Sequence, residues 1–568
     1  MKLKYIVIAA LLLSTSSCQN VIDIPAQGVL SEDQINTFED ADALVIAAYS
    51  QLGNDHYNYP FSLWPYGNVR SDDAYKGGRD PNDIANYHFL ENFQNIQTNN
   101  SAFDVLWYRI YIGIRRVNSA MAALKTFDPN NHPTLNTRLG EMYFLRGYWY
   151  LKLKTLFKYV PYIDDELPAN EYENKTNREL TDQALWDKIA SDFQMAIELL
   201  PATQTEVGRA NQIAAYAYYA KTRLYQAYVQ DEENQVVSID DSLLEEVLSA
   251  TQQVLNSSYG LAPDYADNFL SQSYENGVES IFAVQFSTDD GVGTAGRTDK
   301  GYYITAPQGL GCCDFQKISH NLVNAFKTSS GLPDFENFNT ELADFQSNSF
   351  DPRLDHTVSR PGIPFKYDAS EIVTEGWSRT PSIYGYFNSL KENVSPNCSC
   401  YKIDGAFRGN SKNRIEMRFA DVLLMRAEAL IELSRQDEAL TLINQVRARA
   451  AASTGRLKSP DGSPAALYEA AQYMPGANIV WNQENARKAL RFERRLEFAM
   501  ENMRFFDLVR WGVAEETINA YYERERIRRP NIYNEETVFT AGRDEYLPIP
   551  QAQINFSKGV YTQNTGYE

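Results

Sequence analysis

The sequence has 568 residues and a formal net charge of −21 at pH 7, with 53 Lys and Arg against 74 Asp and Glu. This acidic balance excludes nucleic acid as a general partner, because the protein's field repels a phosphate backbone. Hydrophobic residues make up 43% of the chain, which excludes wholesale disorder, and five cysteines are too few for a disulfide scaffold. Aromatic residues reach 13%, an excess that can supply binding surface as well as core.

The N-terminus has the pattern of a secretory signal peptide. Lys2 and Lys4 precede the apolar run Ile6–Leu13, which is too short to span a bilayer, and small residues then lead to Cys18. A cysteine in this position resembles the cleavage site of a bacterial lipoprotein, whose acylated thiol anchors the chain to a membrane. We therefore expect an exported protein with a signal peptide over residues 1–17 and lipidation at Cys18. The alternative is ordinary signal cleavage near an unrelated cysteine.

Helical periodicity dominates two long blocks of the chain. The first block contains expected helices at Ala41–Leu52, Phe103–Lys125, Leu135–Phe157, Asp182–Leu200, Arg209–Gln230 and Ser242–Asn256. In the second block, Phe419–Leu433 and Asp437–Ala450 are joined by a tight turn, which is typical of a tetratricopeptide unit. We predict a mainly α protein with about four tetratricopeptide-like helical hairpins, loop-rich regions and minor β structure. Ordinary helical hairpins are the alternative, because no strict repeat is visible.

Two stretches lack helical periodicity. Gly53–Asn100 interrupts the first block, and Ser257–Arg414 is rich in Gly, Pro, Asn, Asp and aromatic residues, with an expected strand at Ser280–Phe286 and a short helix near Ser319–Lys327. Long non-periodic stretches in a compact domain are usually functional loops. The predicted divisions are a signal peptide (1–17), an N-terminal helical region (18–256), and a C-terminal region (257–568) made of a loop-rich insert (257–414) and a helical part (415–568).

Sequence motifs give no support for cofactor, metal or catalytic chemistry. Gly291–Gly296 matches G-x-G-x-x-G after a strand, but no helical pattern follows it, so a pyrophosphate would meet no helix N-terminus. The five histidines never pair at metal-ligand spacing, and no pair of carboxylates stands out as a glycosidase site. We predict no catalytic residue, no cofactor and no metal site.

Four further cysteines lie in the loop-rich insert. Cys312 and Cys313 are adjacent, and one residue separates Cys398 from Cys400. Cross-pairing would pin two loops together, a bond between neighbours would close a strained small ring, and free thiols are a third arrangement. The sequence does not assign the connectivity.

Charged residues alternate with aromatic ones in Arg494–Gly512. The acidic residues Glu497, Glu501 and Asp507 lie three or four positions from the basic residues Arg494, Arg504 and Arg510. Because pairing at these spacings explains the pattern, we interpret the segment as a structural helix whose ion pairs join neighbouring units, in preference to a ligand site.

Several segments, taken together and in order, carry a resemblance to a known family. They are the lipoprotein start followed by Trp107–Met121, Leu139–Pro161, Gly208–Tyr228, Arg418–Leu430, Ile443–Ala450, Glu493–Gly512 and Tyr546–Ile554. Over essentially the whole mature chain, the sequence resembles the SusD/RagB family of surface glycan-binding lipoproteins. These are scaffold segments, so they do not name the ligand.

The resemblance implies a fold, a location and a partner. A member of this family is a non-catalytic lipoprotein on the outer face of the outer membrane. It binds oligosaccharides on a loop-rich face and helps deliver them to a SusC-like TonB-dependent transporter. Two alternatives are a surface-anchored glycoside hydrolase and a peptide-binding member of the same family.

Carbohydrate recognition needs an aromatic ring against the apolar face of a pyranose and polar side chains around its hydroxyl rim. The candidate ligand contacts are therefore Trp64, Tyr66, Asp72, Asp73, Tyr75 and Arg79 in the first loop region, and Tyr302, Tyr303 and Trp377 in the second. We expect Trp377→Ala or Tyr303→Ala to weaken binding without changing the melting temperature. The alternative for each residue is packing within its own loop.

Overall fold

The structure is a computed structural model that describes residues 35–291 and 296–567. The expected signal peptide, Cys18 and the centre of the Gly291–Gly296 loop lie outside the described residues. No helix in the described part of the chain is long and apolar enough to cross a membrane.

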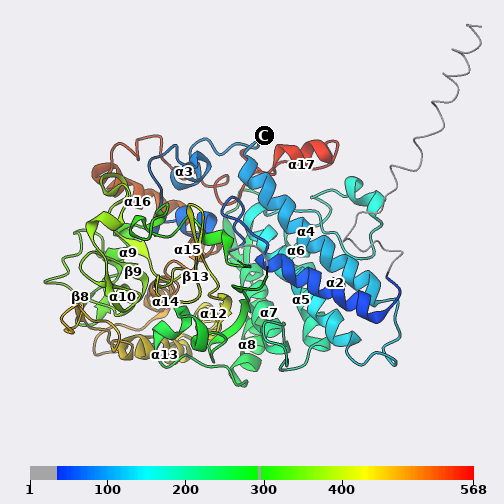
Figure 1. Ribbon diagram of the computed structural model, residues 1–568, viewed down its shortest axis with the longest axis horizontal. Coiled ribbons are helices and arrows are strands. Elements are labelled where there is room, and N and C mark those ends of the chain that lie inside the picture. The colour runs from blue at the N-terminus through cyan, green and yellow to red at the C-terminus, as the bar shows by residue number, and fades with distance from the viewer. Residues whose placement is uncertain (1–34, 292–295, 568) are drawn as a thin grey trace, which may run out of the picture.

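Helical hairpins stack side by side to form the scaffold. The four hairpins in the described residues pair α2 (Phe38–Ser50) with α4 (Ser101–Leu124), α5 (Leu135–Phe157) with α6 (Asp182–Leu199), α7 (Gln212–Ala227) with α8 (Asp241–Leu255), and α12 (Phe419–Glu432) with α13 (Gln436–Ala452). Successive hairpins touch through α4 and α5, α6 and α7, and α8 and α12. Figure 1 shows α2 and α4 to α8 on one side of the molecule. The mainly α, tetratricopeptide-like scaffold is confirmed.

Local sequence explains how these helices begin and how closely they pack. Asp240 caps α8 by accepting hydrogen bonds from the amides of the next residues, so that helix begins at Asp241 rather than at Ser242. Gly113 lets α4 approach α5, because a Cβ there would lie 2.6 Å from Cε2 of Trp149. The hairpins are therefore held at distances that larger side chains would not allow.

The loop-rich insert leaves and re-enters the scaffold at neighbouring helices. Strand β4 (Ser280–Val284) pairs antiparallel with β15 (Arg414–Arg418), and β15 runs directly into α12. Because α8 contacts α12, the third and fourth hairpins are adjacent although residues 257–414 separate them in sequence.

Short strands tie the two loop regions into one body. One four-stranded sheet has the order β1 (Ala74–Gly77), β5 (Phe315–Ile318), β12 (Asn388–Ser389) and β9 (Val358–Ser359), so the first loop region pairs with the insert. A second has the order β16 (Leu467–Tyr468), β8 (Ser349–Phe350), β6 (Lys327–Ser329) and β7 (Leu332–Pro333). The remaining pairs are β2 (Tyr228–Gln230) with β3 (Val236–Ile239), β10 (Pro364–Phe365) with β11 (Asp368–Ile372), and β13 (Tyr401–Asp404) with β14 (Phe407–Asn410). Short helices within these regions are α3 (Ala85–Asn92), α9 (His320–Ala325), α10 (Arg353–Thr357) and α11 (Pro381–Tyr384).

The segment Arg494–Gly512 is two helices rather than the single helix that its pattern predicts. The C-terminal helices are α14 (Gln483–Glu497), α15 (Arg504–Arg510), α16 (Ala514–Arg528) and α17 (Gln551–Phe556). Between α14 and α15, Met500 and Asn502 have φ values of +64° and +68°, which a right-handed helix does not allow.

Ion pairs of this segment reach distant parts of the chain. Glu497 pairs with Arg418 at 2.5 Å, with Arg353 at 3.0 Å, and with Arg449, and all four side chains are buried. Asp507 and Arg510 do pair at the predicted spacing, at 2.6 Å. Removing one member of such a buried network would leave an uncompensated charge, so the network fixes how α14 sits against the insert and α12–α13.

Candidate functional site

Three predicted aromatic contacts of the first loop region lie in the interior. Trp64, Tyr66 and Tyr75 are completely buried. Nε1 of Trp64 donates a hydrogen bond to the carbonyl oxygen of Gly301 at 3.0 Å, and Oη of Tyr75 donates to Oε2 of Glu525 at 2.9 Å. These side chains connect the loop to the insert and to α16.

The two predicted aspartates have internal partners as well. Asp72 pairs with Arg504 at 2.8 Å and with Arg495 at 2.9 Å, and Asp73 pairs with Arg495 at 2.7 Å. Burial alone raises the pKa of Asp72, but the two arginines outweigh that effect and lower it below its ordinary value. We therefore assign Trp64, Tyr66, Asp72, Asp73 and Tyr75 to the interior and leave them out of the candidate surface.

Tyr303 packs within the insert, and Tyr302 lies where the insert meets the break between α14 and α15. Tyr303 is buried, and its hydroxyl group shares a hydrogen bond of 2.6 Å with Oγ1 of Thr298. Tyr302 is half-buried, and its Oη accepts a hydrogen bond from Nδ2 of Asn502 at 2.7 Å. Tyr302 also lines a cavity between the scaffold and the insert.

Arg79 is exposed, as its predicted role requires. Its side chain is 66% exposed, and its Nε donates to Oδ2 of Asp80 at 2.8 Å. Its carbonyl oxygen accepts a hydrogen bond from Oγ1 of Thr380 at 2.8 Å, and Arg379 pairs with Asp83 at 3.1 Å. These contacts join residues 79–83 to the segment that follows Trp377.

Trp377 is buried immediately before this junction in the sequence. It is 9% exposed and packs against Phe365, with ring centroids 5.1 Å apart. Its indole also covers Gly309, where a Cβ would lie 2.3 Å from the ring. Trp377 therefore presents little surface and fixes the backbone of two loops.

Two further segments complete an exposed surface. Nε of Arg408 donates to the carbonyl oxygen of Leu310 at 2.6 Å, and Phe407 lies beside Tyr57 with ring centroids 5.2 Å apart. Tyr386 is 36% exposed. We call this set the loop surface and define it as the exposed and half-buried residues of segments 79–83, 308–313, 375–386 and 401–408, together with Tyr57.

Sequence patterns did not predict most of the residues on this surface. Asp83, Thr380, Tyr386 and Phe407 carry no motif, and their roles follow from contacts between loops that are far apart in sequence. Arg379 had a signal, because it lies two residues after Trp377 in a loop with a charged and aromatic composition.

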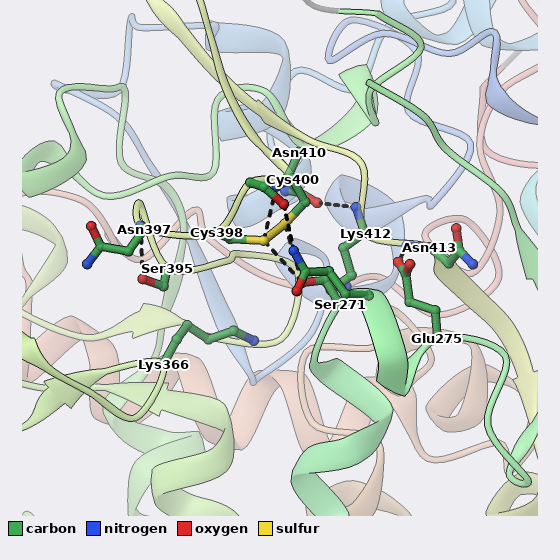
Figure 2. The surroundings of a disulfide bond; sticks show 12 residues. Ser271, Glu275, Lys366, Ser395, Asn397, Cys398, Cys400, Asn410, Lys412 and Asn413 are labelled. Atoms are coloured by element: carbon green, nitrogen blue, oxygen red, sulfur yellow. Dashed lines mark hydrogen bonds between the residues drawn. A yellow bond between two sulfur atoms is a disulfide. The ribbon is translucent and has the colours of Figure 1, made fainter. Parts of the chain in front are cut away.

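The cysteines adopt one of the arrangements that the sequence left open for each pair. Cys398 and Cys400 form a disulfide, whereas Cys312 and Cys313 are free. Figure 2 shows the disulfide beside Ser271 and Asn410, and Oγ of Ser271 lies 3.2 Å from Sγ of Cys398. The bond closes the turn before β13, so it shapes one border of the loop surface.

Two acidic residues of the loop surface, Asp80 and Asp83, pair with arginines. The hydrogen bond from Arg79 lowers the pKa of the Asp80 carboxyl group. Within the described residues, no three His, Cys, Asp or Glu side chains are grouped so that they could hold a metal ion. The loop surface thus offers charged hydrogen-bonding groups beside aromatic rings.

Comparison with known proteins shows a family that spans this architecture. A family model described as "SusD family" matches residues 278–567, and one described as "Starch-binding associating with outer membrane" matches residues 63–224. The chain belongs to the SusD family.

Relatives of this SusD family member match it over nearly its whole length. It is 24% identical to SusD-like protein P2 from Formosa agariphila over the full length of both chains. A solved SusD superfamily protein from Bacteroides vulgatus is 22% identical, with a TM-score of 0.69 over 94% of this chain and 99% of that one. Surface glycan-binding protein A from Bacteroides thetaiotaomicron, solved in complex with laminarihexaose, is 21% identical, with a TM-score of 0.63 over 93% of this chain and all of that one. These structures share its fold.

Proposed function

We propose that this SusD family member binds oligosaccharides at the loop surface and does not cleave them. The observation that carries the proposal is the junction of Arg79, Asp83 and Arg379, which places two guanidinium groups and a carboxylate on one exposed face. The related surface glycan-binding protein A holds laminarihexaose in its solved structure, which supports a carbohydrate as the ligand class.

The chemistry of the loop surface suits sugar hydroxyl groups. Guanidinium groups donate hydrogen bonds to hydroxyl oxygens, and carboxylates accept hydrogen bonds from hydroxyl groups. Tyr386, Phe407 and Tyr57 add aromatic faces that can contact the C–H face of a pyranose.

The electrostatics of the surface favour binding over hydrolysis. A glycosidase needs a carboxylic acid whose pKa is raised, so that it can protonate the leaving oxygen. The Asp80 pKa is instead lowered by Arg79, and Asp83 is paired with Arg379. No cofactor enters the proposal.

The proposed location and partner follow from the sequence pattern and the family. We infer that Cys18 carries the lipid anchor, that the protein stands on the outer face of the outer membrane, and that it delivers its ligand to a SusC-like TonB-dependent transporter. The family description "Starch-binding associating with outer membrane" supports this setting. Nucleic acid is not among the proposed partners.

An array of plant, host and microbial glycans, together with peptides, tests the ligand class. We expect saturable binding to at least one oligosaccharide and a loss of tenfold or more in the R79A/R379A double variant. Arg435→Ala is the matched control, because Arg435 is an exposed, ion-paired arginine at the turn between α12 and α13. Shortening of a bound oligosaccharide would establish the hydrolase alternative, and binding to peptides alone would establish the peptide alternative.

A further inference from the structure

A cavity of about 150 Å³ lies where the helical scaffold meets the insert. Helices α5 and α7 form one wall, the strand that leads into α12 and the residues before it form another, and the break between α14 and α15 closes a third. A single water needs only ~10–15 Å³, so this seam cavity has room for a molecule of several non-hydrogen atoms. It is separate from the loop surface, and only half-buried Tyr302 among the predicted ligand contacts lines it.

Nearly all charges on the cavity wall are neutralised by ion pairs. Lys152 and Arg414 both pair with Glu416, at 3.0 and 2.8 Å. Lys391 pairs with Glu501 at 2.7 Å. Asp299 and Lys221 also have ion-pair partners of opposite charge.

Two charged side chains on the wall are exceptions. Glu392 is 7% exposed, and its Oε1 has no hydrogen-bond partner among the described residues. Lys412 is half-buried, and no carboxylate oxygen in the described part of the chain lies within the 4.0 Å of its ammonium group that an ion pair requires. Figure 2 shows Lys412 beside Asn410, whose Oδ1 accepts a hydrogen bond from the backbone amide of Lys412 at 3.1 Å. Charges that folding removes from water are normally paired, so buried Glu392 and half-buried Lys412 stand out.

Neutral polar groups and aromatic rings fill the rest of the wall. Oγ of Ser62 is buried without a partner in the described residues, and side chains of Asn268, Asn410 and Asn413 also line the space. Tyr302 and Phe269 contribute aromatic surface. Concave sites with an aromatic lining and a few convergent polar groups are typical of small-molecule binding.

We propose that the seam cavity binds a single polyhydroxylated ring, either a monosaccharide or one residue of a sugar chain, between Glu392 and Lys412. A hydroxyl group donates to Oε1 of Glu392, a second accepts from Nζ of Lys412, and the C–H face of the ring lies against Tyr302 or Phe269. The inference goes beyond the loop surface and uses none of its residues.

A zwitterionic amino acid would also complement one acid and one base. The uncharged groups on the wall favour the sugar, because amides and a serine hydroxyl match hydroxyl groups that carry both a donor and an acceptor. A zwitterion would in addition have to lose the hydration of two full charges on entering the cavity.

Calorimetric titration of the mature protein tests this site with D-glucose, D-galactose, D-mannose, L-fucose, glycine and L-alanine as probes. We expect saturable binding of at least one monosaccharide. Lys412→Met and Glu392→Gln should each lower the association constant tenfold or more. Lys412→Met removes the charge of a half-buried side chain while keeping most of its length, and thermal unfolding would verify that the variant is folded.

Two control variants separate this site from the loop surface. Lys125→Met changes a lysine at the end of α4 that pairs with Asp165, outside both the cavity and the loop surface, and it should leave monosaccharide binding unchanged. Arg379→Ala should also leave it unchanged, whatever happens to oligosaccharide binding on the array. Absence of monosaccharide binding, binding of the amino acids instead, survival of binding in both cavity variants, or loss of binding in Arg379→Ala would each overturn the proposal.

Discussion

Oγ1 of Thr380 donates a hydrogen bond to the carbonyl oxygen of Arg79 at 2.8 Å, joining two loops that are 301 residues apart. Arg379, the preceding residue, pairs with Asp83 in the same loop as Arg79. The relative position of the two arginines on the loop surface therefore depends on these two contacts.

The variant Thr380→Val tests whether this hydrogen bond organises the loop surface. The loss of one hydrogen bond typically costs about 0.5–1.5 kcal/mol, so the association constant for the bound oligosaccharide should fall by up to about tenfold. Calorimetry would measure this change. Thr126→Val is the control, since Thr126 makes a comparable hydrogen bond to a carbonyl oxygen at the end of α4, and that variant should bind normally.

Trp377→Ala is now expected to affect stability as well as binding. The sequence predicted an unchanged melting temperature, but Trp377 packs in a small core with Phe365, Val373 and Leu390. Truncating a buried tryptophan costs roughly 3–5 kcal/mol, and the loops on both sides would lose their support. Thermal unfolding and calorimetry on the same sample would measure both effects, and an unchanged melting temperature would contradict the packing described for this residue.

Glu497→Gln should strongly destabilise the protein. The substitution leaves Arg353, Arg418 and Arg449 around a neutral amide, and breaking a buried charge network of this kind costs about 3–5 kcal/mol. Urea denaturation would report the loss. Glu438→Gln removes an exposed carboxylate that pairs with Arg435 on the surface, and should cost no more than about 1 kcal/mol.

The buried carboxyl group of Glu545 should make the free energy of unfolding depend on pH. Burial raises the pKa of Glu545 to about 7, above the ordinary value of 4.5. The folded state then holds this proton more tightly than the unfolded state, so the stabilising contribution is complete below pH 4.5 and is lost as the pH rises to about 7. Ionisation of Glu545 should therefore lower the free energy of unfolding of the wild type by about 1–3 kcal/mol between pH 4.5 and about 7. The Glu545→Gln variant should lack this decrease.

Unfolding free energies measured at several pH values between 4 and 8 would isolate this effect as the difference between wild type and variant. Glu535→Gln, a change in an exposed carboxylate of the same C-terminal region, provides the control. Parallel curves for wild type and Glu545→Gln would contradict the prediction.

Cys18→Ala tests the proposed anchor. Without the thiol that would carry the acyl chains, the mature protein should leave the membrane fraction and appear in the medium or the periplasm. A SusC-like transporter should co-purify with the wild-type protein extracted from membranes in mild detergent. Retention of the variant in the membrane fraction would require a different anchor.

The helices could be predicted because their apolar periodicity is local. The helix expected at Leu135–Phe157 has those bounds in the structure, and the helix at Asp182 ends one residue earlier than expected. The break between α14 and α15 escaped prediction because charged and apolar residues continue at helical spacing across it, while the left-handed residues Met500 and Asn502 give no compositional signal.

Loop burial could not be predicted because it depends on distant partners. Tyr75 meets Glu525 across 450 positions, and Asp72 meets Arg504 across 432. An aromatic or acidic residue in a loop has the same local pattern whether or not such a partner exists. Arg79, in contrast, pairs with Asp80, its immediate neighbour in sequence, and its side chain is 66% exposed.

The insert leaves the scaffold after α8 and returns at α12, and these two helices touch each other. The two ends of the insert are therefore held in place by adjacent helices. The loops between them can change in length and composition without altering the stack of hairpins. Grafting the insert of a relative onto this chain, together with strand β1 that pairs with it, should transfer ligand preference while the stack of hairpins stays the same.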